Sequence, residues 1–199
     1  MKSNVCKIQN GTRDLDAILR ESERVAEYCA LTHTESLRLR LLCEELDGML
    51  PNLIDEFYGD FWIEAEDGVC KINASIEIPE FSSTKKEELI AIAKNKKNAA
   101  AVGIVGKIRD AIENILLIGK EAEVYYPASS DFHLATGFSE GIDYSYIWSL
   151  EQYRTNVKEA GKEEEWDELE KSVIAAAADD VIVSVRSRRA NIAIVKSFK

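Results

Sequence analysis

Two adjacent carboxylates, Glu44 and Glu45, are the side chains of this sequence whose type and setting could support chemistry. They lie in the segment ESLRLRLLCEELDGMLPNL, whose apolar residues recur at helical spacing. In such a helix Glu44 shares a side with Leu37, Leu41 and Gly48, which indicates a second, partly covered face. A carboxylate on that face needs a partner or acquires a raised pKa. Both residues can also be ordinary surface charges beside the arginines of the same helix.

The cysteines and histidines predict no metal centre. The four cysteines are far apart and show no Cys-x-x-Cys spacing, and the chain has only two histidines. Clustered ligands of this kind are what a zinc site requires. Cys29, Cys43 and Cys70 fall on apolar-periodic positions, where a thiol packs as a small hydrophobe. We therefore expect core cysteines, no disulfide framework and no bound metal.

Composition excludes several classes of function. The chain has 199 residues, 46% of them apolar and 31% charged, which is enough for one domain over residues 1–199. Its net charge of −11 argues against a protein that coats nucleic acid or an anionic membrane, because both require a basic surface. No apolar run approaches the roughly 20 residues that span a bilayer, and residues 1–9 lack a signal-peptide core. We expect a cytoplasmic protein with no nucleic-acid or membrane partner.

A helix followed by a hairpin gives the clearest structural signal. Thr32 and Glu35 form a capping box that begins the helix, and Pro51 is expected to end it at Leu50. Two runs of alternating apolar and polar residues follow, over 60–65 and 70–78, on either side of an Asp-Gly turn. One face of this sheet is apolar and the other is polar. The pattern predicts an α+β two-layer sandwich, with helices on one face of a mostly antiparallel mixed sheet.

The other elements extend this order. A strand is expected over 4–9, helices over 15–29, 88–97, 99–117 and 163–178, and a final hairpin over 181–185 and 191–198. Residues 84–160 form a helical, aromatic-rich, lid-like insertion in this interpretation. Its segment 125–153 concentrates aromatic residues, which fold onto the domain or form a recognition surface.

This order of elements resembles the GHKL-type ATPase fold of histidine-kinase ATP-binding domains and of the serine kinases that act as anti-sigma factors. The resemblance covers most of the chain, with residues 84–160 at the place of the ATP lid. It implies that Glu44 is the base that activates a hydroxyl group. The family has an Mg²⁺-ligating Asn four residues later, where this chain has Gly48. Asp47 and Asn52 are the nearest polar residues, and neither stands at the position of that ligand.

The nucleotide loops of the family are also altered. Its Asp-x-Gly-x-Gly loop, which reads adenine, is replaced here by Ile78-Pro-Glu-Phe-Ser-Ser83. Glu77 or Glu80 could accept a hydrogen bond from adenine, but the glycines are missing. The glycine-rich segment before the last helix is reduced to Gly161, beside glutamates that repel a triphosphate. The candidate nucleotide pocket therefore consists of Glu44, Asp47, Gly48, Asn52, Glu77 and Glu80.

Three hypotheses follow. The first is a cytoplasmic regulatory protein with a degenerate GHKL-like fold, which acts by contact with a protein partner and has little or no catalytic activity. The second is an ATP- and Mg²⁺-dependent serine kinase that uses Glu44 as its base. The third is a small-molecule binder with a pocket under residues 125–153. A homodimer is compatible with each of them.

Overall fold

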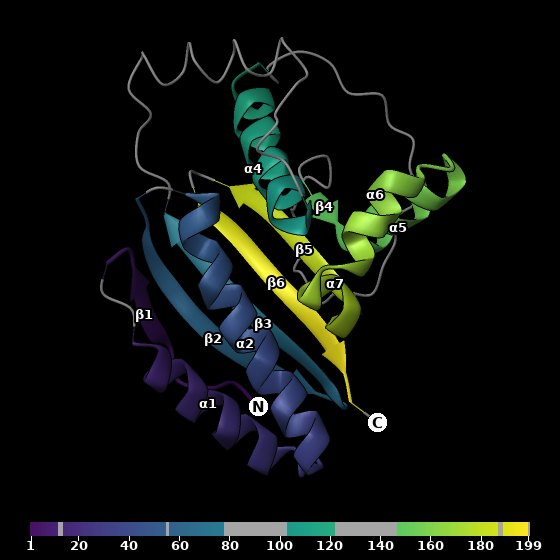
Figure 1. The fold of residues 1–199 in the computed structure, drawn as a ribbon. Helices are drawn as coiled ribbons and strands as arrows, with labels where there is room; N and C mark the ends of the chain where they lie inside the picture. Colours follow the sequence, from purple (N-terminus) through teal and green to yellow (C-terminus); the bar gives the residue numbers. More distant parts are fainter. Residues whose placement is uncertain (12–13, 55, 78–102, 122–146, 187–188, 199) are drawn as a thin grey trace.

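The structure is a computed structural model, and it describes residues 1–11, 14–54, 56–77, 103–121, 147–186 and 189–198. A six-stranded sheet forms one layer, with the strand order β1-β2-β3-β6-β5-β4 (Figure 1). The strands are β1 (Cys6–Gln9), β2 (Tyr58–Glu66), β3 (Val69–Glu77), β4 (Ile147–Ser149), β5 (Asp180–Arg186) and β6 (Arg189–Ser197). Every neighbouring pair is antiparallel. The predicted α+β class is confirmed, whereas the expected mixed sheet is wrong for this part of the chain.

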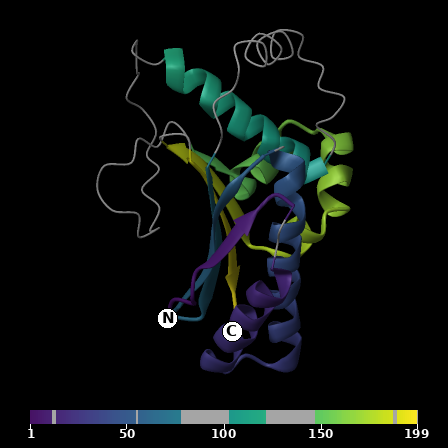
Figure 2. The same ribbon diagram turned by 90° about the vertical axis from the view of Figure 1, so that its left-hand side faces the viewer.

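Helices form the second layer. They are α1 (Leu15–Tyr28), α2 (His33–Leu53), α4 (Gly103–Glu121), α5 (Leu150–Glu159), α6 (Glu163–Glu170) and α7 (Val173–Ala177). The edge-on view shows α1 and α2 on one face of the sheet, with α4 across its upper end (Figure 2). Elements from both ends of the chain contribute to a single cluster of buried apolar residues between the layers.

The β2–β3 hairpin and α2 supply the centre of that core. Phe61 and Ile63 of β2 and Ile72 and Ile76 of β3 are fully buried, as their alternation with polar residues predicts. Against them lie the buried leucines of α2, which are Leu39, Leu42, Leu46 and Leu50. Burial of apolar side chains of this size is the main contribution to folding, at about 1.5–3 kcal/mol each.

The boundaries of α2 confirm its predicted start and correct its predicted end. Thr32 caps the helix in a capping box with Glu35, whose carboxylate accepts from the Thr32 backbone N–H at 2.8 Å. The helix does not end at Leu50, because it continues through Pro51 to Leu53. Proline removes only one hydrogen-bond donor there, and the Ile54 N–H still bonds to the Leu50 carbonyl at 3.2 Å.

The predicted helix over 163–178 is two helices. Lys171 and Ser172 lie between α6 and α7, and the Ser172 hydroxyl accepts from the Ala175 N–H at 3.2 Å as an N-cap. Val173, the first residue of α7, is 43% exposed. The short α6–α7 link thereby turns the chain back towards α2, which α7 contacts.

The described parts of residues 84–160 belong to the same two layers. Helix α4 contacts α2, α6 and β5, and β4 pairs with β5 at the edge of the sheet. Helix α5 also packs against β5. The expected helix over 88–97 and most of the aromatic segment lie outside the described residues. Within the part of the chain that is described, no helix is both long enough and apolar enough to cross a membrane.

Two glycines give matched tests of this packing. A Cβ on Gly59 would lie 2.1 Å from the Ser75 carbonyl oxygen in β3, whereas a Cβ on Gly48 would meet no atom within 4 Å. We expect Gly59→Ala to destabilise the fold by about 1–3 kcal/mol, because backbone must move to relieve the overlap. Gly48→Ala should stabilise it by up to about 1 kcal/mol, because alanine favours helix. Urea unfolding of the two variants measures both effects, and equal shifts would contradict the register of β2 and β3.

Candidate functional site

A hollow of about 520 Å³ opens beside α2, between that helix, the start of α4 and the α6–α7 link. We call it the α2 hollow. Its lining comprises Glu44, Glu45, Gly48, Met49, Asn52, Gly103, Ile104, Val105, Glu168, Lys171, Ser172, Val173 and Ile174. Three of the predicted pocket residues, Glu44, Gly48 and Asn52, therefore do lie together in one cavity.

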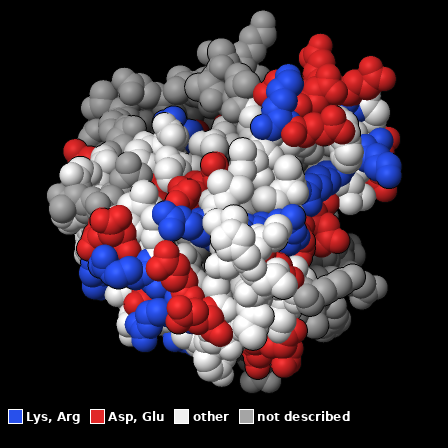
Figure 3. All heavy atoms as spheres, turned by 60° about the horizontal axis from the view of Figure 1, so that its bottom comes forward, with Lys and Arg blue, Asp and Glu red and all other residues white. Residues whose placement is uncertain are grey.

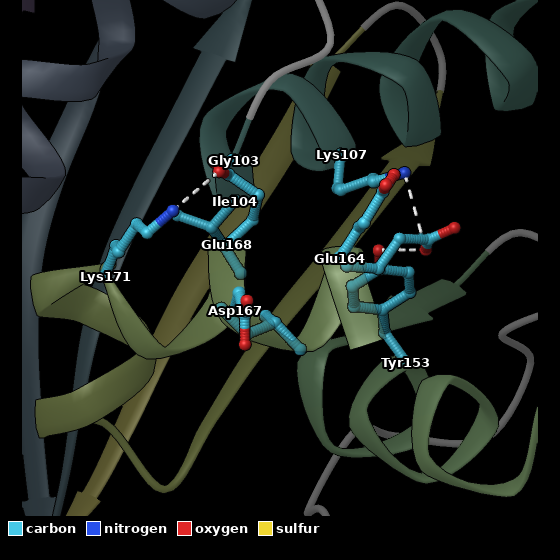
Figure 4. Close-up of a pocket in the computed structure, with 10 residues that line it drawn as sticks. Gly103, Ile104, Lys107, Tyr153, Glu164, Asp167, Glu168 and Lys171 are labelled. Carbon is cyan, nitrogen blue, oxygen red and sulfur yellow. Dashed lines mark hydrogen bonds and ion pairs between the residues drawn. The ribbon is translucent and has the colours of Figure 1, made fainter. Parts of the chain in front are cut away.

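A second hollow, of about 440 Å³, adjoins the first and is called the Tyr153 hollow. The two share Gly103, Ile104, Glu168 and Lys171. Figure 4 shows Tyr153 on one side of this second hollow and Lys171 on the other, with the start of α4 above them. The beginning of α4 and the end of α6 thus separate the two cavities.

Glu44 is already engaged by an arginine. Its carboxylate accepts a hydrogen bond from the Arg40 Nε at 3.0 Å, one turn earlier on α2. Arg40 also reaches Glu23 of α1 at 3.3 Å. The Glu44 side chain is 37% exposed, so this ion pair lies at the rim of the hollow. One oxygen of the Glu44 carboxylate is therefore occupied by the Arg40 guanidinium group.

The structure does not bring Asp47 to the other candidates. Asp47 is only 4% exposed and lies among the buried positions of α2, whereas Gly48 is exposed. Asn52 lines the hollow, but its side-chain amide donates to the Gly48 carbonyl at 3.5 Å and so turns back onto its own helix. Asp47 and Asn52, the polar residues nearest to the position of the missing Mg²⁺ ligand, therefore point in different directions.

Glu77 lies on the other side of the sheet. It follows the buried Ile76 in β3, and its carboxylate pairs with Arg189 of β6 at 3.7 Å. A hydrogen bond to Glu77 also raises the pKa of Tyr58, which is its cross-strand neighbour in β2. Because successive residues of a strand alternate between faces, Glu77 cannot reach the helix layer that holds Glu44. Glu80 lies outside the described residues.

The charges of the α2 hollow are predominantly negative. Glu44, Glu45 and Glu168 line it, and Lys171 is its one cationic side chain among the described residues. The Lys171 ammonium is paired with the Glu168 carboxylate at 3.2 Å, and both groups are exposed. No group of three His, Cys, Asp or Glu side chains within the described ranges is placed to hold a metal ion. The electrostatics of this site therefore disfavour a polyphosphate.

Apolar side chains continue from the hollow along the outer side of α2. Leu37 and Leu41 are 52% and 38% exposed, and with Glu44 and Gly48 they form a line of residues one helical turn apart. We call these four residues the α2 stripe. Val173, across the hollow, is also exposed. Figure 3 shows uncharged atoms across the middle of the lower surface, with acidic and basic side chains around them.

Sequence reasoning missed the opposite wall of the hollow. Lys171 to Ile174 were expected inside a continuous helix and not at a site. The Lys-Ser dipeptide is the available signal, because serine is a preferred N-cap residue and could have indicated a new helix start at 172. That this start faces α2 depends on the tertiary fold.

Tyr153 of α5 organises a polar network in the second hollow. Its hydroxyl donates to Glu165 at 2.6 Å, and Lys162 and Lys107 approach the same carboxylate at 2.9 and 3.7 Å. The hydrogen bonds from Tyr153 and Lys162 lower the pKa of Glu165 below its usual value. Burial and the Glu165 carboxylate raise the pKa of Tyr153. The centre of the Trp148 ring lies 6.0 Å from that of the Tyr153 ring, so the two rings pack against each other.

Comparisons of the chain with protein-family models, with curated proteins and with solved structures found no match.

The Tyr153 network gives a pH-dependent prediction. We expect Tyr153→Phe to raise the pKa of Glu165 towards its ordinary value, because the largest favourable contact of the carboxylate is lost. A depressed carboxyl pKa contributes stability at pH values above the pKa of the unfolded chain, and this contribution disappears as pH falls through the folded pKa. The variant should therefore lose stability near pH 7 and differ less from the parent in acid.

The measurement is a pH titration of the glutamate side chains by NMR, with urea unfolding at the same pH values. Tyr28→Phe is the matched control, because that tyrosine is 68% exposed on α1. An unchanged Glu165 pKa in the Tyr153 variant would contradict the hydrogen bond described above.

Proposed function

We propose that the chain is a cytoplasmic regulatory protein that has a degenerate GHKL-like scaffold and acts by binding a protein partner through the α2 hollow and the α2 stripe. The observation that carries this proposal is an open cavity beside α2 whose described charged side chains are three glutamates and one lysine, the lysine being paired with Glu168. The cavity beside α2 supports the GHKL-like scaffold, but its charges differ from those that a nucleotide pocket requires.

The order of elements supports the scaffold. A strand, two helices and a hairpin are followed by helices and by a final hairpin, β5–β6, that lies next to β3 in the sheet. This is the order on which the resemblance to GHKL ATPases rests. The α2 hollow lies along the helix that would carry the catalytic glutamate in those proteins.

The contacts in the hollow disfavour phosphotransfer. A general base needs a free carboxylate oxygen near the hydroxyl group that it activates. In this structure the Glu44 carboxylate accepts a hydrogen bond from the Arg40 guanidinium group. Position 48 provides no metal ligand, and the described lysine of the hollow is paired with Glu168. An ATP-dependent kinase that uses Glu44 remains the alternative, and it would require Arg40 to release the carboxylate.

The Tyr153 hollow favours a second candidate function, which is the binding of a small molecule. It combines an aromatic ring, two lysines and several carboxylates around about 440 Å³, a volume within the range of small-ligand pockets. Most of the aromatic segment that first suggested such a pocket lies outside the described residues, so the proposal rests on Tyr153 itself.

Charge complementarity indicates the kind of partner that fits the α2 hollow. Exposed Leu37, Leu41 and Val173 offer apolar contact. Glu45 places negative charge beside them, and a basic group of a partner could share the Glu44 carboxylate with Arg40. The whole chain carries a net charge of −11, which attracts cations over a longer range. We infer a cationic amphipathic segment of another protein, which would lay its apolar side on the leucines and its basic side on the carboxylates.

A synthetic probe tests this inference. We expect a fluorescein-labelled peptide of alternating lysine and leucine blocks, about 18 residues long, to bind the chain at low salt with an increase in anisotropy. The double variant Glu44→Gln/Glu45→Gln should weaken binding about 10-fold, because it removes two charges at the edge of the apolar surface. The affinity of each protein is measured by titration at two salt concentrations.

The matched control removes the same net charge elsewhere. Glu27→Gln/Glu151→Gln changes two exposed carboxylates on α1 and α5 that line neither hollow. It should keep close to the parent affinity. Equal losses in the two double variants would show that only net charge attracts the peptide, and the α2 hollow would then not be the binding site.

A further inference from the structure

A third hollow, of about 510 Å³, lies at the end of α1 beside the turn between β2 and β3. It is separate from the two hollows above and shares no residue with them. Two of the four cysteines, Cys29 and Cys70, line it, together with Tyr28, Leu31 and Phe198 among others. We call it the thiol hollow.

The fold brings these two cysteines together from distant positions in the sequence. Cys29 is the C-cap residue of α1, where its backbone N–H donates to the Val25 carbonyl at 2.9 Å. Cys70 is the second residue of β3, points into the core and pairs across the sheet with Ala65 and Lys196. The Cys29 and Cys70 side chains therefore meet at one hollow, and Cys29 is close enough to contribute to the raised pKa of the Cys70 thiol.

The two remaining cysteines are placed differently. Cys43 is fully buried in α2, and Cys6 lies in β1 at the edge of the sheet. Neither lines the thiol hollow. Cys29 is only partly buried, so it is the thiol of the pair that a small oxidant entering the hollow would meet first.

We propose that Cys29 and Cys70 form a disulfide when the chain is exposed to a peroxide. The Cys29 thiolate attacks one peroxide oxygen, the O–O bond breaks, and the departing hydroxide takes up a proton, which leaves a sulfenic acid on Cys29. The Cys70 sulfur then attacks the Cys29 sulfur, the S–O bond breaks, and the hydroxyl group leaves as water with the Cys70 proton. Two thiols are oxidised and one peroxide is reduced to water.

The environment of Cys70 indicates that it is the thiol that attacks the sulfenic acid on Cys29. Burial, and then the neighbouring Cys29, raise the pKa of the Cys70 thiol to about 12. A thiol with a raised pKa is mostly protonated near pH 7, so its attack on the sulfenic acid should be slow there and faster in alkali.

The modification would act at the joint between α1 and α2. Cys29 is followed by Ala30, which has a positive φ of 51°, and by Thr32, which caps α2. A bond from Cys29 to β3 would fix the end of α1, and hence this turn, to the sheet. The proposal uses no residue of the α2 hollow, so it can fail or succeed independently of the function proposed above.

The test is mass spectrometry of the full chain before and after treatment with hydrogen peroxide. Unfolding and alkylation should label all four cysteines before treatment and only two, Cys6 and Cys43, afterwards. Proteolysis without reduction should then yield one linked pair of peptides, containing Cys29 and Cys70. The disulfide should form faster at pH 9 than at pH 7, because thiolates are the attacking species in both steps.

Two variants provide the controls. Cys29→Ala should leave no disulfide under the same treatment, and Cys6→Ala should form it as the parent chain does. The peptide map of the parent decides the proposal even if a change at the buried Cys70 prevents folding. Labelling of all four cysteines after peroxide, or linkage of any other pair, would overturn it.

Discussion

The packing of α2 on the β2–β3 hairpin is the constraint on which the rest of the structure depends. Four buried leucines of the helix meet the apolar side of the central strands, and this contact fixes how α2 is rotated. Once the leucine side faces the sheet, Leu37, Leu41, Glu44 and Gly48 must face away from it, because a helix repeats every 3.6 residues. The position of the α2 hollow therefore follows from the core.

The same constraint separates the residues that a nucleotide would need to have together. Asp47 is turned into the buried side of α2, and Glu77 faces the opposite side of the sheet. Glu44, which is bonded to Arg40, remains beside the cavity with Gly48 and with Asn52, whose amide is bonded to its own helix. The exposed Lys171–Glu168 ion pair lies opposite them. The volume of the cavity would allow a nucleotide-sized ligand, whereas its acidic side chains favour a cationic group. Charge is the stronger argument, because the described lining adds Glu45 to two carboxylates that already hold Arg40 and Lys171, which leaves a triphosphate without a counter-charge.

The sequence predicted the elements whose signals are local. The capping box at Thr32 and the alternation around the Asp67-Gly68 turn identified α2 and the hairpin, and that alternation already placed Glu77 on the polar face. The antiparallel edge strand β4 was missed, because it is only three residues long and depends on pairing with β5, about 30 residues later in the chain. The α6–α7 link was missed as a wall of the site for a related reason, since its contact with α2 is non-local. Local patterns thus identified one side of the hollow, and the tertiary fold supplied the other.

We propose that the chain has a GHKL-like scaffold whose cavity beside α2 does not bind a nucleotide. Isothermal titration of the chain with ATP, with and without Mg²⁺, tests it most directly. The account predicts no saturable heat up to about millimolar nucleotide, a concentration at which binding would be worth only about 4 kcal/mol. Micromolar binding that requires Mg²⁺ and disappears in Glu44→Ala would contradict it, and would show that Glu44 serves a working nucleotide site.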